Sequence, residues 1–279
     1  MAVNDDGMHD KGVVITGGAS GIGLATAKVF ANRGARLLLA DIETEALADA
    51  AEQVAAAGAS VVETQTCDVS SLEAVQQLAD VADERLGGTY ILFNNAGVAV
   101  GGPIAQMSHD DWRWIIDVDL WGAIHGVEVF LPRMLAQGQG GHILFTSSFA
   151  GLVPNVGLGP YCVAKYGVVA LAEVLRREVR DSQIGVSVLC PMRVGTNIGA
   201  SERNRPQHYG AAESSVVPDQ AEANDDLAGR VISVEEVAER VLAAIDANEL
   251  YVLPHPESRE FVRRRFSRID DAFGRQHGS

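Results

Sequence analysis

Tyr161 and Lys165 place a phenol and an ammonium four residues apart, in the run Tyr161-Cys162-Val163-Ala164-Lys165. On a helix this spacing puts both side chains on one face, about one turn apart. A tyrosine by itself titrates near pH ~10 and exchanges protons poorly at neutral pH. An ammonium held close to the phenol favours the phenolate and moves the pair toward useful acid–base chemistry. Solvated helix faces carry the same spacing by chance, so the interpretation depends on what the rest of the chain supplies.

A glycine-rich turn, residues 16–23, directly follows the first apolar run and opens the first helical pattern. Glycines there let the backbone turn sharply and approach a pyrophosphate at a helix N-terminus. The Gly-x-x-x-Gly-x-Gly spacing differs from the more familiar Gly-x-Gly-x-x-Gly fingerprint, and a tight turn without a ligand is the alternative. Because the turn lies between a strand and a helix, we predict a dinucleotide site. Its contacts are expected from Gly17, Ala19, Ser20, Gly21, Ile22 and Gly23.

Asp41 is the residue expected to choose between the two nicotinamide cofactors, because it ends the second apolar run. A carboxylate about twenty residues beyond the turn accepts a hydrogen bond from a ribose 2′-hydroxyl and repels a 2′-phosphate. The turn contains no Lys or Arg, and the residue after Asp41 is Ile42, so nothing nearby neutralises a phosphate. Asp41 and Ile42 therefore favour NAD over NADP, with a solvated loop aspartate as the alternative.

Polar residues also follow the third and fourth apolar runs. Asp68 and Val69 follow the third run, and Asn95, Ala96 and Gly97 follow the fourth. Open α/β sheets bind ligands at the carboxyl ends of their strands, so these residues are expected to line the cofactor site. An asparagine at the end of an apolar strand needs a buried backbone group or a ligand to satisfy its amide.

Apolar runs alternate with amphipathic stretches along the chain, and this alternation predicts the elements that position these residues. Near-continuous apolar runs are typical of parallel strands covered on both faces. The expected strands are 13–16, 36–40, 60–66, 90–94, 142–147, 184–190 and 250–253. The expected helices are 21–32, 44–57, 71–86, 108–137, 161–181, 233–246 and about 255–273. We predict an α/β fold, a Rossmann-type doubly wound parallel sheet of about seven strands with helices on both faces.

Composition limits the classes of function. The 279 residues contain 22 Lys plus Arg against 37 Asp plus Glu, a net charge of −15, which argues against a nucleic-acid or anionic-membrane partner. No run approaches about 20 apolar residues, so no membrane-spanning helix is expected. The polar residues 1–10 lack a signal-peptide pattern and are expected to be a disordered lead-in to a single domain, 11–279, in the cytoplasm.

Ser148 lies thirteen residues before Tyr161, and this spacing completes a set of elements that resembles the short-chain dehydrogenase/reductase family. The resemblance covers about residues 11–195, with the motifs in the family's order and spacing. It implies that Tyr161 is the general acid in ketone reduction and the base in alcohol oxidation. It also implies that Lys165 binds the nicotinamide ribose and lowers the Tyr161 pKa, and that Ser148 binds the substrate oxygen. Further cofactor contacts are implied for Pro191, Val194 and Thr196.

The resemblance also implies partners and cofactors. The expected cofactor is NAD, which carries the hydride, so no metal is needed. The expected substrate is a small-molecule secondary alcohol or ketone. A homotetramer or homodimer is implied, using the helices at 108–137 and 161–181.

Two positions depart from the family pattern. Asp119 stands where the family usually has asparagine, in the run Val118-Asp119-Leu120-Trp121-Gly122. A role for the backbone carbonyl survives this change, whereas a carboxylate near Lys165 would neutralise it and weaken its hold on Tyr161. Met192 stands where glycine is common and is expected to change a pocket wall.

A narrower resemblance points to the branch that contains the Cα-dehydrogenases of lignin aryl-ether breakdown. It rests on Trp114-Ile115-Ile116, Gly141-His142-Ile143, Asn197-Ile198 and Tyr251-Val252-Leu253-Pro254. It implies a bulky apolar or aryl substrate, with a steroid or another hydrophobic hydroxy compound as the alternative. Ser148, Val98, Val156 and Met192 are expected to line the substrate pocket, beneath a lid at about 196–229. A cofactor-binding regulator with little catalysis, suggested by Asp119, is the alternative from a different class.

The last predicted helix has an apolar side formed by Phe261, Phe266, Ile269 and Phe273. It also carries the cluster Arg263-Arg264-Arg265, which lies among acidic residues. We expect this cluster to be a solvated face rather than an anion site.

Overall fold

The computed structural model of this protein describes residues 8–210 and 229–278. Residues 1–7, most of the predicted lead-in, lie outside the described residues. Met8, near the end of that lead-in, is buried, and its carbonyl accepts a hydrogen bond from the Lys11 amide.

Seven parallel strands form one sheet in the order β3-β2-β1-β4-β5-β6-β7. They are β1 (Gly12–Thr16), β2 (Arg36–Asp41), β3 (Val61–Thr66), β4 (Ile91–Asn94), β5 (Gly141–Thr146), β6 (Ile184–Leu189) and β7 (Tyr251–Val252). The strand order changes direction between β1 and β4, and such a switch point opens a crevice at the carboxyl ends of the strands. The predicted doubly wound parallel sheet of about seven strands is confirmed.

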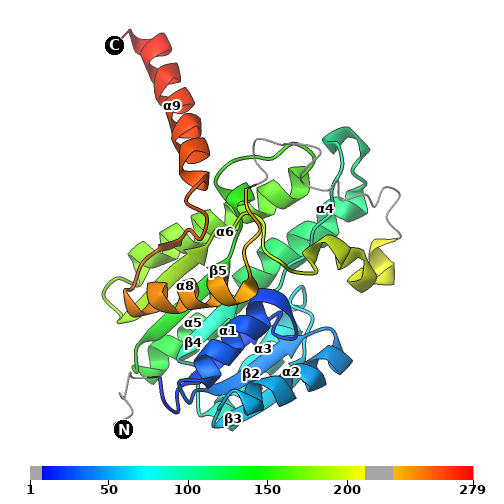
Figure 1. The fold of residues 1–279 in the computed structure, drawn as a ribbon, viewed down its shortest axis with the longest axis vertical. Helices are drawn as coiled ribbons and strands as arrows, with labels where there is room; N and C mark the ends of the chain where they lie inside the picture. Colours follow the sequence, from blue (N-terminus) through cyan, green and yellow to red (C-terminus); the bar gives the residue numbers. More distant parts are fainter. Residues whose placement is uncertain (1–7, 211–228, 279) are drawn as a thin grey trace.

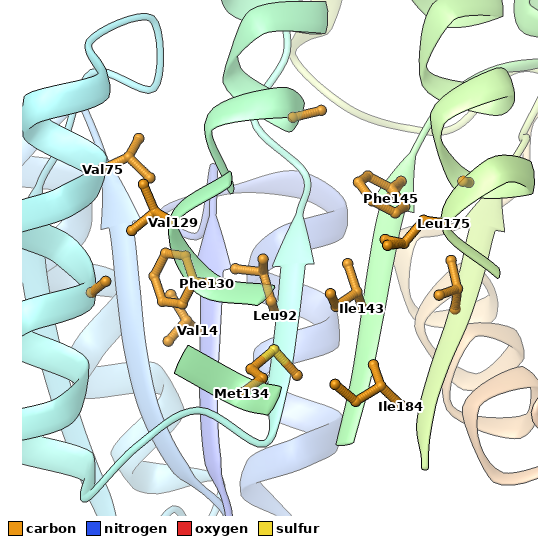
Figure 2. Packing of buried hydrophobic residues seen from close by; sticks show 14 of the residues in the cluster. Val14, Val75, Leu92, Val129, Phe130, Met134, Ile143, Phe145, Leu175 and Ile184 are labelled. Atoms are coloured by element: carbon orange, nitrogen blue, oxygen red, sulfur yellow. The ribbon is translucent and has the colours of Figure 1, made fainter. Parts of the chain in front are cut away.

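Successive residues of each strand face opposite sides of the sheet, so each side has its own core. On one side, Val14, Leu92 and Ile143 pack with residues of α3 (Leu72–Val81), α5 (Gly122–Gln137) and α6 (Gly159–Glu178), as Figure 2 shows. On the other side, Val13, Ile15 and Ile91 pack with α1 (Gly21–Ala31), α2 (Thr44–Ala56) and α8 (Val234–Asp246). This burial of both faces explains why the strands read as unbroken apolar runs.

The helix predicted over 108–137 is divided into three parts. α4 (His109–Ile116) begins at a capping box between Ser108 and Asp111, a π-helical segment η3 (Asp117–Trp121) follows, and α5 continues the path. The helix predicted over 71–86 likewise continues from α3 into a π-helical segment, η1 (Ala82–Leu86). Single π-helical turns inside α-helices are frequent at functional sites.

Short 3₁₀ helices make up part of the predicted lid. η5 (Ile198–Asn204) and η6 (Gln207–Tyr209) follow the loop after β6, and residues 211–228 of the predicted lid lie outside the described residues. Two more 3₁₀ turns, η2 (Ile104–Gln106) and η4 (Phe149–Gly151), lie in the loops after β4 and β5.

The chain ends in α9 (Ser258–His277), which projects away from the rest of the molecule (Figure 1). The predicted terminal helix is therefore present and extends four residues beyond the predicted end at Phe273. Across the described chain, no helix has both the length and the apolar character needed to cross a membrane.

Candidate active site

Two cavities lie at the carboxyl ends of the central strands and meet at Tyr161. The first cavity has a volume of about 400 Å³, and residues of the glycine turn, Asp41 and Lys165 line it. A second cavity of about 410 Å³ is lined by Ser148 and Met192. Tyr161 lines both cavities. A group held in the first cavity can therefore face a molecule held in the second across the phenol.

α6 positions Tyr161 and Lys165 in its first two turns. The helix begins with Pro160 in its first turn, where a missing N–H costs no hydrogen bond. Tyr161 is 7% exposed and Lys165 is 1% exposed. The Lys165 Nζ lies 5.4 Å from the centroid of the Tyr161 ring and donates a hydrogen bond to the Thr146 carbonyl at 3.2 Å. The pair is thus buried in the site and is not a solvated helix face.

Asp119 reaches Lys165 with its side chain. Its Oδ2 lies 3.0 Å from Lys165 Nζ, and both side chains are at most 2% exposed. Its Oδ1 accepts a hydrogen bond from the Val98 amide at 2.8 Å. Gly97 leaves room for the pair, because a Cβ there would lie 3.2 Å from Lys165 Nζ. The substitution of Asp for the usual Asn therefore places a carboxylate directly against the lysine.

Burial and charge act on these three groups in opposite directions. Burial raises the pKa of Tyr161, the Lys165 ammonium lowers it, and the Asp119 carboxylate raises it again. Burial opposes the charge of Lys165, but Asp119 reverses this effect, and the net pKa of Lys165 is raised. Burial also raises the pKa of Asp119, against the pull of Lys165. The Lys165 ammonium at 3.0 Å and the Val98 amide both favour the charged form of Asp119, and the raised pKa of Tyr161 favours its protonated phenol.

Ser148 follows β5 and faces the second cavity. Its Oγ accepts a hydrogen bond from the Ala150 amide at 3.1 Å and caps η4. Ser148 lowers the pKa of Tyr161 through its side chain, and the two residues line the same cavity. Two hydroxyl groups directed at one point can hold the oxygen of a carbonyl or an alcohol.

The glycine turn is fixed by Asn95 at the end of β4. The Asn95 Nδ2 donates to the carbonyls of Thr16 and Gly17, both at 3.1 Å, and its Oδ1 accepts from Thr146 Oγ1 at 2.9 Å. The amide thus satisfies buried backbone groups, one of the two reasons expected for an asparagine here. Asn95, Ala96 and the neighbouring Gly97 line the first cavity.

The turn itself has the shape of a phosphate cradle. Gly17 has a φ of +63°, and a Cβ there would lie 2.9 Å from the Ala96 Cα. A Cβ on Gly23 would lie 2.1 Å from the Gly17 carbonyl. Ser20 makes no side-chain cap on α1, so within the described chain the first amides of α1 remain open to an anion. These features fit a dinucleotide, and Ser20, Gly21 and Ile22 line the cavity.

Asp41 lines the same cavity. Its Oδ2 accepts from the Ala19 amide at 3.1 Å, and its Oδ1 accepts from the amides of Ile42 and Glu43 at 2.8 Å and 3.2 Å. Three backbone donors therefore hold the carboxylate in one orientation, at a wall that it shares with Ile42. Such a carboxylate is pre-organised to accept a ribose hydroxyl.

The remaining predicted cofactor contacts lie on two walls. Asp68 and Val69 line the first cavity, and the Asp68 Oδ1 accepts from the Ser70 amide at 2.9 Å. Pro191 and Val194 line the second cavity, and Thr196 lines both. All predicted cofactor residues except Ala19 and Gly23 thus line one of the two cavities, and Ala19 contributes its amide to Asp41.

The predicted substrate pocket is only partly assembled. Met192 lines the second cavity, and Val98 lines the first. Val156 is 74% exposed and is not among the residues that line either cavity. The assignment of Val156 to the pocket wall is therefore corrected: the loop before α6 turns this side chain outward. The apolar wall beside Ser148 is formed by Phe149, Leu158 and Met192.

Three side-chain contacts of the lid segment carry no sequence signal. The Glu43 carboxylate accepts from Arg203 at 2.7 Å and from Asn204 at 2.8 Å, and all three residues line the first cavity. Arg205 forms a buried ion pair with Asp111 at 2.6 Å. Glu43 and Arg203 are 160 residues apart, so only the fold brings them together.

A further contact fixes the other end of this segment. The Tyr209 hydroxyl donates to Asp117 at 2.9 Å. η5 and η6 are thus each connected to other elements by side-chain hydrogen bonds.

Comparisons with known proteins agree with this geometry. A family model described as short chain dehydrogenase matches residues 11–207. The chain is 35% identical to a Cα-dehydrogenase of Sphingobium sp. (strain NBRC 103272 / SYK-6), over 95% of this chain and 87% of the relative. It is 34% identical to a 1-deoxy-11-beta-hydroxypentalenate dehydrogenase of Streptomyces avermitilis, over 92% of this chain and 88% of the relative.

Solved structures give the same result. A short chain dehydrogenase/reductase from Burkholderia phymatum in complex with NAD has a TM-score of 0.87 and 38% identity, over 94% of this chain and 95% of that chain. The apo form of LigD from Sphingobium sp. strain SYK-6 has a TM-score of 0.79 and 32% identity, over 95% and 97% of the two chains. Both the broad resemblance and the narrower one drawn from the sequence are confirmed.

Proposed function

Because this chain belongs to the short-chain dehydrogenase family of oxidoreductases, we propose that it interconverts a secondary alcohol and a ketone with NAD, using Tyr161 as the acid and base. The observation that carries the proposal is the meeting of Ser148, Tyr161 and Lys165 where the two cavities join. NAD, when bound, supplies the hydride acceptor or donor. It would be held by the glycine turn, Asp41 and Lys165.

The residues of this chain supply the proton and bind the substrate oxygen. In ketone reduction, the oxygen gains negative charge, and the hydroxyls of Ser148 and Tyr161 both donate to it. Tyr161 then gives its proton to that oxygen, and its raised pKa keeps the phenol protonated at neutral pH until the transfer. In alcohol oxidation, Tyr161 must first be deprotonated, and the Lys165 ammonium stabilises the phenolate.

The wall of the second cavity supports a bulky apolar or aryl substrate. Phe149, Leu158 and Met192 give it an apolar surface, and about 410 Å³ is within the usual range for a small-molecule site. A steroid or another hydrophobic hydroxy compound is the alternative class, because it needs the same apolar wall. A panel of aryl and alicyclic secondary alcohols separates the two classes by kcat/KM.

The direct test of the proposed chemistry is Tyr161→Phe. This variant keeps the ring but loses the proton, so we expect NADH binding within about twofold of wild type and a kcat lower by about 10²–10⁴. Fluorescence titration measures binding, and NADH absorbance measures turnover. Turnover close to that of wild type would remove Tyr161 from the mechanism.

A cofactor-binding regulator is the second candidate function, and the buried Asp119–Lys165 pair is the observation that favours it. A lysine neutralised by a carboxylate stabilises a phenolate less, which would suppress oxidation. Tight NADH binding together with no turnover on any alcohol or ketone of the panel would support the regulator.

Family membership also supports a homodimer or homotetramer through the helical path from α4 to α5 and through α6. Exposed apolar residues on these elements agree with such contacts: Trp121 is 46% exposed, Val163 is 51% exposed and Val174 is 54% exposed. The mass of the protein in solution tests this assignment.

A further inference from the structure

α9 loses contact with the rest of the protein after about two turns. Phe261 packs edge-on against Phe149, with ring centroids 5.8 Å apart, and the Arg265 guanidinium lies 5.1 Å from the Tyr166 ring. Every residue from Phe266 to Asp271 is exposed. Figure 1 shows that no other element of the described chain runs along this part of the helix.

A projecting helix of this kind is not expected to be stable alone. Its 20 residues span about 30 Å. In proteins, most of the stability of a helix comes from packing of its apolar face rather than from intrinsic helix propensity. Phe266 is 57% exposed, Ile269 is 43% exposed and Phe273 is 63% exposed, so the face that should pack has no partner within the described chain.

The spacing of the apolar residues identifies the kind of partner. Val262, Phe266, Ile269 and Phe273 follow one another at intervals of four, three and four residues, which is the a/d repeat of helices that pack along one another. This repeat forms a narrow seam that fits another helix better than a flat surface. A groove of about 580 Å³ between Pro154 and α9, lined also by Ile269 and Phe273, leaves room beside the seam.

The charge of α9 is opposite to that of the remaining chain. α9 carries six arginines against three carboxylates, a net charge of +3, whereas the whole chain carries −15, so the other residues carry −18. A second copy of this chain therefore offers an acidic body to each basic helix. The same acidic body would be repelled by an anionic membrane, the other surface to which basic amphipathic helices bind.

We propose that α9 is a self-association element, which pairs antiparallel with α9 of a second copy about a twofold axis between Ser267 and Arg268. In this register Val262 packs against the partner's Phe273, and Phe266 packs against the partner's Ile269. All four residues of the seam are then covered by the same set of residues on the other helix, as a twofold contact requires.

The antiparallel direction also matches the charges along the helix. Arg263 and Asp270 lie on the same flank of the seam, seven residues apart, and the antiparallel register brings each Arg263 beside the partner's Asp270. A parallel pair would instead oppose the two Arg263-Arg264-Arg265 clusters. Arg263, one residue of the arginine cluster expected from the sequence to be a solvated face, is thereby assigned to an interface. Self-association through α9 is independent of the proposed chemistry.

The first experiment measures the mass of the intact protein by light scattering and sedimentation over a wide range of concentration. The double variant I269E/F273E should halve the mass of the wild-type assembly, because it puts carboxylates into the seam. Ile104→Glu, which changes a residue that is 65% exposed elsewhere, is the matched control and should leave the mass unchanged. Val163→Glu, on α6, reports separately on the interface expected from the family.

The second experiment tests the register by exchanging charges. Arg263→Asp and Asp270→Arg should each raise the dissociation concentration about tenfold, because each puts like charges across the pair. The variant carrying both changes should recover wild-type association. Arg263 and Asp270 lie too far apart on one helix to contact each other, so recovery requires the other copy.

Three results would overturn the proposal. The first is a wild-type protein that is monomeric at every concentration. The second is an I269E/F273E variant with the same mass as wild type. The third is a monomer that binds vesicles of anionic phospholipid through α9, since this would assign the helix to a membrane surface. If Arg263→Asp and Asp270→Arg each weakened association and the variant carrying both changes did not recover it, the antiparallel register would be wrong.

Discussion

At the residue scale, the Lys165 ammonium interacts with two oxygen atoms and with an aromatic ring. Its Nζ lies 3.0 Å from the Asp119 carboxylate, 3.2 Å from the Thr146 carbonyl and 5.4 Å from the centre of the Tyr161 ring. In a buried site the nearer, opposite charge interacts more strongly with the ammonium than the phenol does. The Asp119 carboxylate also acts on Tyr161 directly and raises its pKa. Asp119 is therefore expected to set the pH range in which Tyr161 can act as a base.

The change Asp119→Asn tests this role through the pH dependence of alcohol oxidation. Removing the carboxylate removes one cause of the raised Tyr161 pKa and leaves the Lys165 ammonium unopposed. The phenolate then forms at lower pH, so the rise of kcat/KM for oxidation with pH should move toward neutral pH. Ketone reduction should lose activity at correspondingly lower pH, because it needs the protonated phenol. Steady-state kinetics in both directions measure the two profiles.

Asp117→Asn is the matched control, because Asp117 lies in the same π-helical segment but bonds to Tyr209. Its pH profile should superimpose on that of wild type. Identical profiles for wild type and Asp119→Asn would mean that only the backbone at 119 matters, as in the family pattern.

Asp41 gives a second prediction at this scale, on the choice of cofactor. Its carboxylate is fixed by the amides of Ala19, Ile42 and Glu43, so a 2′-phosphate would meet a held negative charge. We expect kcat/KM to favour NAD over NADP by more than about tenfold. In Asp41→Asn the amide oxygen still accepts hydrogen bonds but the charge is gone, so the preference should narrow by about 10–100-fold, mainly through better use of NADP.

Asp49→Asn, on the exposed side of α2, is the control and should keep the wild-type ratio. A wild-type enzyme that prefers NADP would contradict the assignment of Asp41 to the ribose.

At the element scale, η3 explains why Asp119 reaches Lys165. The helical path from α4 to α5 passes through π-helical geometry at residues 117–121, which changes the direction of the side chains around Asp119. The apolar periodicity correctly predicted helix across this region, but a π-helical turn has no pattern of its own. The sequence could therefore show that Asp119 departs from the family pattern and could not show that its carboxylate touches the lysine.

The clamp between Glu43 and η5 gives a prediction on cofactor release. Glu43 belongs to the loop before α2, and its hydrogen bonds to Asn204 and Arg203 hold the lid segment over the first cavity. The same bonds lower the pKa of Glu43, so the carboxylate is ionised at neutral pH. Glu43→Ala should speed NADH dissociation by about threefold to tenfold, as expected for one partly exposed ionic contact plus a hydrogen bond. Stopped-flow fluorescence measures the release rate.

Asp80→Ala provides the comparison, since Asp80 forms an equally short ion pair with Arg133 at the surface. It should leave the release rate unchanged. An unchanged rate in Glu43→Ala would show that opening of the lid segment does not limit NADH release.

At the scale of the whole molecule, local sequence patterns were sufficient to predict the architecture, but they could not predict the long-range contacts. Val13 and Val14 both read as apolar, and the fold buries them on opposite faces of the sheet, so continuous runs were sufficient to predict parallel strands. The outward turn of Val156 depends on the path of a loop, which residue type does not fix. The same holds for α9: the repeat of Phe266, Ile269 and Phe273 predicted an apolar face, and only the structure shows that the described chain does not cover it.

His142 connects the stability of the whole molecule to pH. It lies in β5, is 4% exposed, and its Nε2 is 2.8 Å from the Ser187 Oγ. Ser187 donates its own hydrogen to the Glu249 carbonyl, so its oxygen accepts from a neutral His142. Burial, with a contribution from Arg176, lowers the pKa of His142 to about 4. The native state thus keeps His142 neutral at pH values where an unfolded chain would protonate it.

The direction of the effect follows from proton binding. An unfolded histidine binds a proton below about pH 6.5, and the native protein does so only near pH 4, so acid favours the unfolded state across this window. The free energy of unfolding should fall by up to about 1.4 kcal/mol per pH unit, about 3 kcal/mol in all, from this one group.

His142→Gln keeps an N–H donor for Ser187 and does not titrate, so its stability should fall less on acidification than that of wild type. Urea unfolding from about pH 7 to about pH 4.5 measures the difference. His109→Gln makes the same chemical change at an exposed position of α4 and should follow the wild-type curve. If His142→Gln and wild type were equally sensitive to acid, carboxylates such as Asp111 would control the loss of stability. Burial raises the pKa of Asp111, but its contacts with Arg205 and Ser108 outweigh this effect and lower it.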